Sequence, residues 1–311
     1  MKKVFIDGSA GTTGLRINER LASRGDITLL SIAEEVRKDP AARAKVLNEA
    51  DVVFLCLPDD AAIESASLVT NPDTAVIDTS TAHRVDPEWT FGFPELSGMR
   101  DKIKASKRIA NPGCHASGFI VLVAPLIEAG LLSKDEALSC FSLTGYSGGG
   151  KKMIAQYEDP SRDPLLDGPR FYSIAQKHKH IPEMTAVCGL SKAPVFCPIV
   201  DDFYAGMEVV VPLFTSQLKG SVDDVKKLYQ SCYSEGLVHY QEASGEGGFL
   251  SAAAFAGRDD MEVSVYGNEE RITLVSRFDN LGKGASGAAI QNMNLLLGVP
   301  ATTGLVVPGQ D

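Results

Sequence analysis

The first third of the chain alternates short apolar runs with segments in which apolar residues recur at helical spacing. The runs at 3–6, 27–32, 52–57 and 75–78 predict strands, and segments 13–24 and 61–69 predict helices between them. The run at 52–57, VVFLCL, is continuously apolar, as a strand covered on both faces requires. This rhythm predicts an α/β fold with a Rossmann-like, doubly wound parallel sheet.

The pattern changes after a long apolar segment at 114–132, which predicts a buried helix. The runs at 138–143, 195–200, 206–214, 261–266 and 271–275 predict strands, while 223–234 predicts a surface helix and 284–297 a final helix. Strands with so few helices between them predict an α+β unit on a mostly antiparallel sheet. We therefore expect two domains, one from 1–115 plus 282–311 and the other from 116–281.

Composition narrows the class of protein without changing this architecture. The hydrophobic share of 44% and the charged share of 23% are ordinary for a globular protein of 311 residues. A net charge of −10 argues against a broad nucleic-acid surface. The six cysteines form no CxxC pair, and neither a signal peptide nor a bilayer-spanning segment stands out. We expect a cytoplasmic protein with no nucleic-acid or membrane partner.

A glycine-rich turn, GSAGTTG, follows the first predicted strand and leads into the first predicted helix. Its GxxGxxG spacing is a variant of the dinucleotide fingerprint, in which small residues let backbone N–H groups approach a pyrophosphate at a helix N-terminus. The alternative is a turn that binds no ligand. In this context we predict a cofactor site at Gly8, Ser9, Ala10, Gly11, Thr12, Thr13 and Gly14.

The end of the second predicted strand indicates which nicotinamide cofactor this turn would bind. An NAD site usually places Asp or Glu there to hold the ribose 2′-hydroxyl. Here the strand ends at Ser31, Glu34 and Glu35 come late, and Arg37 and Lys38 follow. A serine with nearby cations suits a 2′-phosphate, so we predict NADP with Ser31 and Arg37 in the site. A solvated loop is the alternative for the two cations.

Cys114 is the best-placed nucleophile in the chain. It follows the turn sequence Asn111-Pro112-Gly113, and the buried helix begins directly at it. The free N–H groups and the dipole of a helix N-terminus favour the thiolate. The other cysteines lie in apolar or strand-like runs or on the surface helix, where a small buried hydrophobe is the ordinary interpretation.

A thiolate nucleophile needs a partner that manages protons. His178 and His180 lie two residues apart in KHKHIPE, where an extended segment would turn both to the same side. No third ligand follows at a recognisable spacing, so we predict no metal. We predict that His180 is the acid–base and that Glu183 orients it, with the flanking lysines favouring a neutral imidazole. A basic exposed loop is the alternative.

Several motifs then occur in one order: GSAGTTG, FLCLPDD, IDTSTAHR, GFPEL, NPGC, GYSGGGK, HKHIPEM and DNLGKGASGAAIQNMNLLLG. Spanning residues 8–298, they resemble the shorter form of the N-acetyl-gamma-glutamyl-phosphate reductases of arginine biosynthesis, which belong with aspartate-semialdehyde dehydrogenase. The resemblance implies that Cys114 attacks N-acetyl-glutamyl phosphate, that phosphate leaves behind a thioester, and that NADPH reduces the thioester to the semialdehyde. It also implies a homodimer or homotetramer formed through the second, catalytic domain, while the first domain binds NADP.

The resemblance assigns further residues by their motifs. Arg84 would bind the substrate phosphate, since its fork pairs two oxygens at once. The substrate-binding set is Arg84, Asn111, Ser147, Gly148, Lys151 and His178, and Pro58, Asn280 and Lys283 join the cofactor site. His178 is the runner-up as acid–base. The family often has Cys-Tyr-Pro-Thr where this chain has Cys-His-Ala-Ser, so His115 is a further rival.

Three other functions stay open on the sequence alone. A related reductase could act on aspartyl phosphate or on N-acetyl-aminoadipyl phosphate, because one methylene is worth only about 1–3 kcal/mol in a pocket. A cysteine hydrolase with a vestigial nucleotide fold would not respond to NADPH. A cofactor-binding regulatory protein would keep its activity without Cys114.

Overall fold

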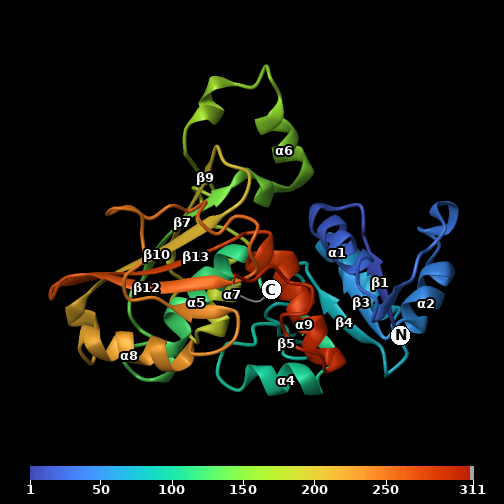
Figure 1. The fold of residues 1–311 in the computed structure, drawn as a ribbon, viewed down its shortest axis with the longest axis horizontal. Helices are drawn as coiled ribbons and strands as arrows, with labels where there is room; N and C mark the ends of the chain where they lie inside the picture. The colour runs from blue at the N-terminus through green and yellow to red at the C-terminus, as the bar shows by residue number, and fades with distance from the viewer. Residues whose placement is uncertain (309–311) are drawn as a thin grey trace. The chain divides into compact units, whose positions relative to one another are not determined.

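The computed structural model describes residues 1–308, and their contacts divide the chain into two units. The first unit contains Met1–Pro94, Gly98–Pro112 and Ala285–Leu305. The second contains Glu95–Ser97, Gly113–Gly284 and, at the end of the described chain, residues 306–308. The first unit is therefore assembled from both ends of the chain, and its last helix, drawn in red in Figure 1, comes from the C-terminal part.

The first unit is built on a six-stranded sheet in the order β2-β1-β3-β4-β6-β5. Every neighbouring pair is parallel, which confirms the predicted doubly wound sheet. The strands are β1 (Lys2–Asp7), β2 (Ile27–Leu29), β3 (Val52–Leu55), β4 (Ala75–Asp78), β5 (Thr90–Phe91) and β6 (Arg108–Ala110). The strand order reverses between β1 and β3, and such sheets bind ligands at the carboxyl ends beside this point.

The helices of this unit cover both faces of the sheet. They are α1 (Thr12–Ala22), α2 (Pro40–Glu49), α3 (Asp59–Ser67), α4 (Met99–Ala105) and α9 (Gly287–Leu297), with a 3-10 turn at Glu34–Val36. One apolar cluster joins alternate strand residues such as Val4 and Phe54 to Ile17 of α1 and Ile290 of α9. The other residues of the same strands face Leu47 of α2 and a second cluster. Because both faces are covered, the strands have continuous apolar sequences.

Two helices and two strands of this unit are not visible in the hydrophobic pattern. Helix α2 buries only three of its ten residues, and α4 buries only Ile103, so neither has a strong apolar stripe. Strands β5 and β6 have only two and three residues. The predicted strand at 27–32 ends at Leu29, since the next residues lie outside the sheet.

The second unit is built on a seven-stranded sheet in the order β11-β12-β13-β10-β7-β9-β8. Four neighbouring pairs are antiparallel, and β7·β9 and β11·β12 are parallel, so the prediction of a mostly antiparallel sheet is confirmed. The strands are β7 (Ser139–Gly145), β8 (Arg170–Phe171), β9 (Val195–Asp201), β10 (Met207–Phe214), β11 (Val238–Tyr240), β12 (Met261–Gly267) and β13 (Arg271–Phe278).

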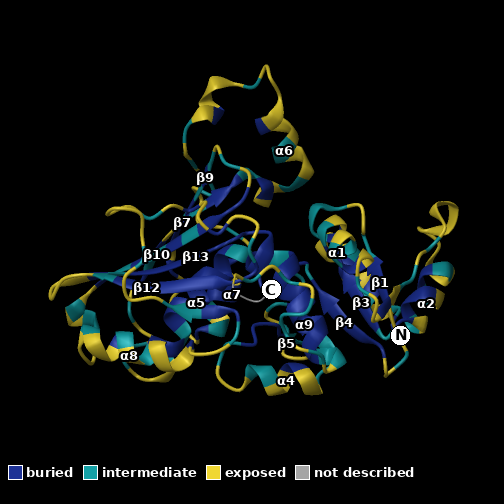
Figure 2. Cartoon of the chain, in the orientation of Figure 1, coloured by how far each residue is buried: buried dark blue, intermediate teal, exposed yellow. Residues whose placement is uncertain are grey.

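Helix α5 (Cys114–Glu128) packs against β10 and β13, and most of its residues are buried (Figure 2). Its close approach depends on Gly118, where an added Cβ would lie 2.4 Å from the Val209 side chain. Helices α6 (Gly150–Glu158), α7 (Ile181–Val187) and α8 (Val222–Cys232) and 3-10 turns at Tyr146–Gly149, Pro164–Asp167 and Thr215–Gln217 complete the unit. Helix α5 ends before the predicted residue 132, and Gly130 follows it at a φ of 72°.

The loop that leads into α9 differs from its prediction. The segment at 284–297 is not one α-helix, because Gly282–Ser286 forms a π-helical turn and α9 begins at Gly287. Within residues 1–308, no helix combines the length and the hydropathy that crossing a bilayer requires.

Candidate active site

Cys114 is the first residue of α5, which makes the predicted placement at a helix N-terminus correct. The residue before it, Gly113, is the N-cap, and its backbone N–H donates a 2.8 Å hydrogen bond to Oε1 of Glu183. Glu183 lies in α7 and is only 1% exposed. Its carboxylate therefore fixes the backbone beside Cys114, a contact that the motif HKHIPEM does not reveal.

The three histidines near Cys114 in the second unit form one cluster. The ring centroids of His178 and His180 are 4.7 Å apart, and His115 lies 5.5 Å from each of them. The expectation of an extended segment is wrong, because His180 has αR angles of −86° and −12° and is the N-cap of α7. Pro182 favours this helix start. The turn, rather than strand alternation, brings the two rings together.

His115 has both ring nitrogens in hydrogen bonds. Nδ1 lies 2.6 Å from Oγ of Ser142 in β7, and Nε2 lies 2.7 Å from the hydroxyl of Tyr172, just after β8. Burial, with a smaller contribution from the charge of His178, lowers the pKa of His115 to about 3. A ring that stays neutral and fully engaged is poorly suited to carry protons. This argues against His115 as the acid–base.

Sequence reasoning missed Tyr172 and Ser142. Ser142 is 0% exposed and occupies an inward-facing position of β7, where an apolar residue is the norm. A polar residue at an inward-facing strand position can be recognised in the sequence, so Ser142 could have been singled out as a functional candidate. Tyr172 offers no such signal, because it follows a two-residue strand.

The glycine-rich segment after β7 contains three of the predicted substrate residues, Ser147, Gly148 and Lys151. The side chain of Asn280 donates to Oγ of Ser147 at 3.0 Å and accepts from the backbone N–H of Gly206 at 2.9 Å. Asn280 therefore supports the loop within the second unit, although the sequence assigned it to the cofactor. Gly148 and Lys151 are exposed, so both are accessible to a ligand.

Lys283 also has a role that its motif does not indicate. Its Nζ lies 2.7 Å from Oε2 of Glu95, and the two side chains are 0% and 2% exposed. A second oxygen of Glu95 accepts from the backbone N–H of Leu237 at 3.4 Å. The lysine predicted to line the cofactor thus forms a buried ion pair inside the second unit.

Gly284 sets the space available to the Cys114 side chain. An added Cβ would lie 2.9 Å from Cβ of Cys114 and 3.1 Å from the backbone oxygen of Asp279, closer than such contacts normally occur.

We expect Gly284→Ala to displace Cys114 and to lower kcat by about tenfold or more, because misplaced reacting groups react slowly. Steady-state kinetics check this. Gly168→Ala, where an added Cβ meets nothing within 4 Å, should keep the parent rate.

The glycine-rich turn of the first unit has the geometry of a dinucleotide cradle. Gly8 has a φ of +90°, and an added Cβ there would lie 2.3 Å from the backbone oxygen of Cys56. At Gly14 it would lie 2.5 Å from the oxygen of Gly8. Gly11 caps α1 without a side-chain hydrogen bond, so backbone N–H groups of the first turn remain for an anion.

The remaining predicted cofactor residues also lie in the first unit. Ser31 and Arg37 are exposed, and Nε of Arg37 lies 2.9 Å from Oε1 of Glu34. An exposed pair of this kind contributes little stability and is easily exchanged for a phosphate. Pro58 is the exposed N-cap of α3, at the carboxyl end of β3.

Arg84 and Asn111 belong to the first unit as well. Arg84 donates from Nε to the oxygen of Asn111 at 3.0 Å and from Nη2 to the oxygen of Thr79 at 3.1 Å. The side chain of Asn111 donates to the oxygen of Ala285 and accepts from Asn292. These contacts hold the loop after β4, so Asn111 is engaged in supporting the backbone.

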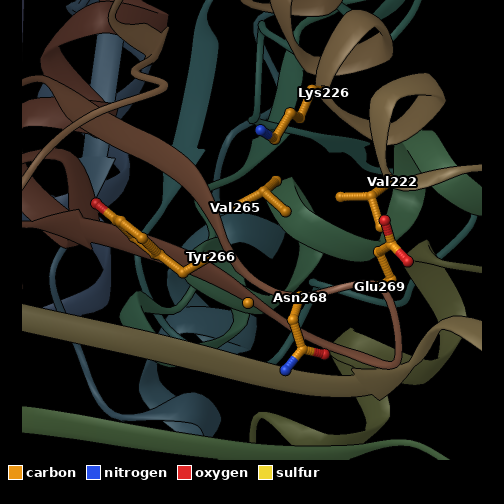
Figure 3. Close-up of a pocket in the computed structure, with 7 residues that line it drawn as sticks. Val222, Lys226, Val265, Tyr266, Asn268 and Glu269 are labelled. Carbon is orange, nitrogen blue, oxygen red and sulfur yellow. The ribbon is translucent and has the colours of Figure 1, made fainter.

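A separate cavity of about 200 Å³ lies beside α8 and the β12–β13 turn (Figure 3). It is lined by Val222, Lys226, Val265, Tyr266, Gly267, Asn268 and Glu269, which include no cysteine or histidine. Among residues 1–308, no group of three His, Cys, Asp or Glu side chains could hold a metal ion.

Comparisons with known proteins cover both units. A family profile described as "Semialdehyde dehydrogenase, NAD binding domain" matches residues 8–106, and one described as "Semialdehyde dehydrogenase, dimerisation domain" matches residues 114–280. The N-acetyl-gamma-glutamyl-phosphate reductases of Brucella ovis and Brucella canis are each 46% identical over 306 residues, which is 95% of this chain and 99% of the relative.

Solved structures show the same fold at low identity. Aspartate semialdehyde dehydrogenase II of Vibrio cholerae, complexed with ASA, has a TM-score of 0.72 at 16% identity and covers 96% of this chain and 98% of its own. Aspartate semialdehyde dehydrogenase of Candida albicans, with NADP, has a TM-score of 0.65 at 16% identity, with coverages of 96% and 98%.

Proposed function

This chain belongs to the family of N-acetyl-gamma-glutamyl-phosphate reductases, and we propose that it catalyses the NADPH-dependent reduction of N-acetyl-gamma-glutamyl phosphate. The products are N-acetyl-glutamate 5-semialdehyde and phosphate. The observation that carries the proposal is the position of Cys114, at the start of a buried helix beside the histidine cluster. A cysteine there is suited to nucleophilic attack on an acyl group.

Cys114 acts first. Its thiolate attacks the carbonyl carbon of the acyl phosphate, a C–S bond forms, the C–O bond to phosphorus breaks, and phosphate departs from the thioester. The N-terminus of α5 stabilises both the thiolate and the oxyanion that forms during attack. The hydrogen bond from Gly113 to Glu183 keeps this backbone in place.

His180 moves the protons. It takes the thiol proton of Cys114, returns a proton to the oxygen of the thiohemiacetal, and removes it again when the C–S bond breaks and the aldehyde leaves. Its place at the N-cap of α7, which also contains Glu183, supports this role. His178, whose Nδ1 accepts from the backbone N–H of His180 at 3.2 Å, is better placed to position the loop and contact substrate.

NADPH, when bound, supplies the hydride that reduces the thioester. Residues 8–14 would hold its pyrophosphate, because the glycines there bring the backbone close and the start of α1 favours the negative charge. Ser31 and Arg37 would take the 2′-phosphate. Arg84 would bind the phosphate of the substrate, with Ser147, Gly148 and Lys151 around its remaining polar groups.

A related acyl phosphate is the second candidate substrate, because the two solved structures named above are aspartate semialdehyde dehydrogenases. The identity of 46% over nearly the whole chain favours the N-acetyl-glutamyl substrate. A cysteine hydrolase is not supported, since the relatives are reductases and dehydrogenases. For an enzyme of this kind we also propose a cytoplasmic location.

We propose a homo-oligomer that forms through the outer face of the second sheet. The opposite face packs on α5, and the outer face leaves large apolar side chains exposed: Phe141 by 43%, Phe171 by 47%, Val195 by 56% and Phe214 by 62%. The strand register places Phe141 beside Val210 and Phe171 beside Ile199. The match of this unit to a dimerisation domain supports a second copy as the occupant.

Phe141→Arg should therefore dissociate the oligomer. A charge on a buried apolar interface is left without a partner, so we expect a shift of at least about tenfold in the dissociation constant. Light scattering after size-exclusion chromatography measures the mass. Lys227→Ala, at an exposed position of α8, which packs with α5 on the opposite face of the sheet, is the control. A parent that is already monomeric at micromolar concentration would overturn the assignment.

The reverse reaction tests the proposed activity. The parent should form NADPH from NADP and N-acetyl-glutamate 5-semialdehyde only when phosphate or arsenate is present, with little turnover of NAD. Faster turnover of aspartate semialdehyde would mean that the substrate assignment is wrong, although the proposed reaction type would stand. No cofactor reduction with either aldehyde would contradict the oxidoreductase assignment.

A further inference from the structure

A glutamine side chain takes over the hydrogen bonds of β8 where that strand leaves the second sheet. Strand β8 pairs with β9 over its two residues, and Tyr172 still donates its backbone N–H to the oxygen of Pro198 at 3.0 Å. The chain then turns away. At the next stretch of β9, Nε2 of Gln176 donates to the backbone oxygen of Phe196 at 2.7 Å, and Oε1 accepts from its N–H at 2.9 Å. Since a side-chain amide donates and accepts as a peptide group does, Gln176 replaces a strand residue here.

The turn between β8 and Gln176 has an unfavourable backbone. Ser173 and Gln176 each have a φ of 56°, and no other non-glycine residue among 1–308 has a positive φ. Side chains crowd the backbone in this left-handed region, so such residues persist where other contacts hold them. Ile174, in the turn, is 77% exposed, so burial does not hold it. Within the described chain, hydrogen bonds from residues 173–177 to the sheet come from Gln176 alone.

Phe196 connects this amide clamp to the histidine cluster. The residue is 1% exposed, and its ring centroid lies 5.1 Å from that of His178 in an edge-to-face arrangement. His178 follows Gln176 by two positions, and its Nδ1 accepts from the backbone N–H of His180 at 3.2 Å. Its backbone oxygen accepts from the N–H of Ile181, the first residue of α7, at 3.0 Å. The contacts therefore continue from Gln176 through both histidines to the start of α7.

We propose that Gln176 is a positioning residue, which clamps the segment 173–180 to the edge of β9 and so holds the rings of His178 and His180 in their cluster. Gln176 acts through these rings and needs no contact with substrate or cofactor. The inference rests on the proposed function in one respect, which is that His180 moves the protons of the reaction. Whether Gln176 holds the segment does not depend on that role.

Amide hydrogen exchange, resolved to single residues, tests the clamp without substrate or cofactor. Gln176→Met keeps the length of the side chain and removes both hydrogen bonds. The amide of Phe196 loses its acceptor directly and reports the clamp, whereas the amides of His180 and Ile181, which donate to His178, report the segment. Losing two hydrogen bonds corresponds to about tenfold or more in a local opening equilibrium. We therefore expect exchange at all three amides to become about tenfold faster.

Steady-state kinetics give the readout that a purely structural role would not change. In Gln176→Met, kcat should fall by about tenfold, because a displaced proton carrier reacts slowly. The affinity for NADP should stay at the parent value, since the glycine-rich turn at 8–14 lies in the first unit. Gln176→Ala, which also removes both hydrogen bonds, should behave in the same way.

Asn71→Leu is the matched control. The side-chain amide of Asn71 also makes one bond of each kind: Nδ2 donates to the backbone oxygen of Asn48 at 3.0 Å, and Oδ1 accepts from the N–H of Asp73 at 3.0 Å. It lies in the first unit, in the loop that precedes β4. This variant should keep the parent kcat and the parent exchange rates at Phe196, His180 and Ile181. Thermal melting of each variant shows whether it is folded.

The outcomes separate the inference from the proposed function. Faster exchange at Phe196 alone, in a folded Gln176→Met, would show that the clamp is local and would overturn the inference. Faster exchange at all three amides with the parent kcat would overturn the positioning role. A parent that turns over neither aldehyde would contradict the proposed function, while the exchange rates still decide whether Gln176 holds the segment. Faster exchange at His180 and Ile181, a lower kcat and an unchanged NADP affinity support the inference.

Discussion

Cys114→Ser should lose at least about a thousandfold in kcat, because a serine hydroxyl is a far weaker nucleophile at neutral pH and the covalent step depends on it. NADP affinity should be unchanged, since the cofactor turn at 8–14 lies in the other unit. The measurement is phosphate-dependent NADPH formation, with NADP binding followed by fluorescence in parallel.

A trapping experiment tests the role of Cys114 without the hydride-transfer step. The parent incubated with the acyl phosphate, and without NADPH, should gain the acyl mass on the peptide that contains Cys114. Cys232→Ser, at the exposed cysteine of α8, is the control and should react like the parent. A Cys114→Ser variant with near-parent turnover would show that another group performs the attack.

Lys283→Met should destabilise the second unit by about 3–5 kcal/mol, because it leaves the carboxylate of Glu95 buried without its cation. Neither side chain is more than 2% exposed, so water cannot replace the lost partner. Denaturant unfolding measures the change in the free energy of unfolding. Lys226→Met removes the ion-pair partner of Glu242, whose own side chain is 64% exposed, and should cost less than about 1 kcal/mol.

The double variant Lys283→Met/Glu95→Leu distinguishes two causes of the lost stability: the unpaired charge of Glu95 and the loss of the lysine side chain itself. It removes both charges and should recover most of the lost stability, since well-packed apolar residues often replace a buried pair without cost. A Lys283→Met variant with the parent's unfolding midpoint but a lower NADP affinity would instead return this lysine to the cofactor site, as its motif suggested.

Whether a helix or strand can be predicted from the hydrophobic pattern depends on how many of its side chains are buried. Strands such as β3 are recognisable because both faces are covered and every residue is apolar. Helix α4 buries one side chain, so its sequence does not differ from that of a loop. Cys114 could be found because turn residues and an apolar helix meet at it.

The partners of the site residues could not be found in the same way. Glu95 lies 188 residues from Lys283 in sequence, and no spacing rule joins them. Tyr172 reaches His115 only because β8 pairs antiparallel with β9 and β9 pairs parallel with β7, which contains Ser142. Such contacts depend on the registers of three strands, and the motif HKHIPEM indicated a local extended segment where the chain in fact turns into α7.

Helix α9 also determines the order in which the chain can fold as it is synthesised. It contributes Ile290 and Met293 to the core that covers Val4 and Phe54, yet the whole of Gly113–Gly284 is translated before it. At about 5–20 residues per second, the ribosome takes roughly 10–30 s over that stretch. During this time the nascent nucleotide-binding sheet has an uncovered apolar face, so a stalled or truncated chain is a natural client for chaperones, and the second unit has time to fold before the first is complete.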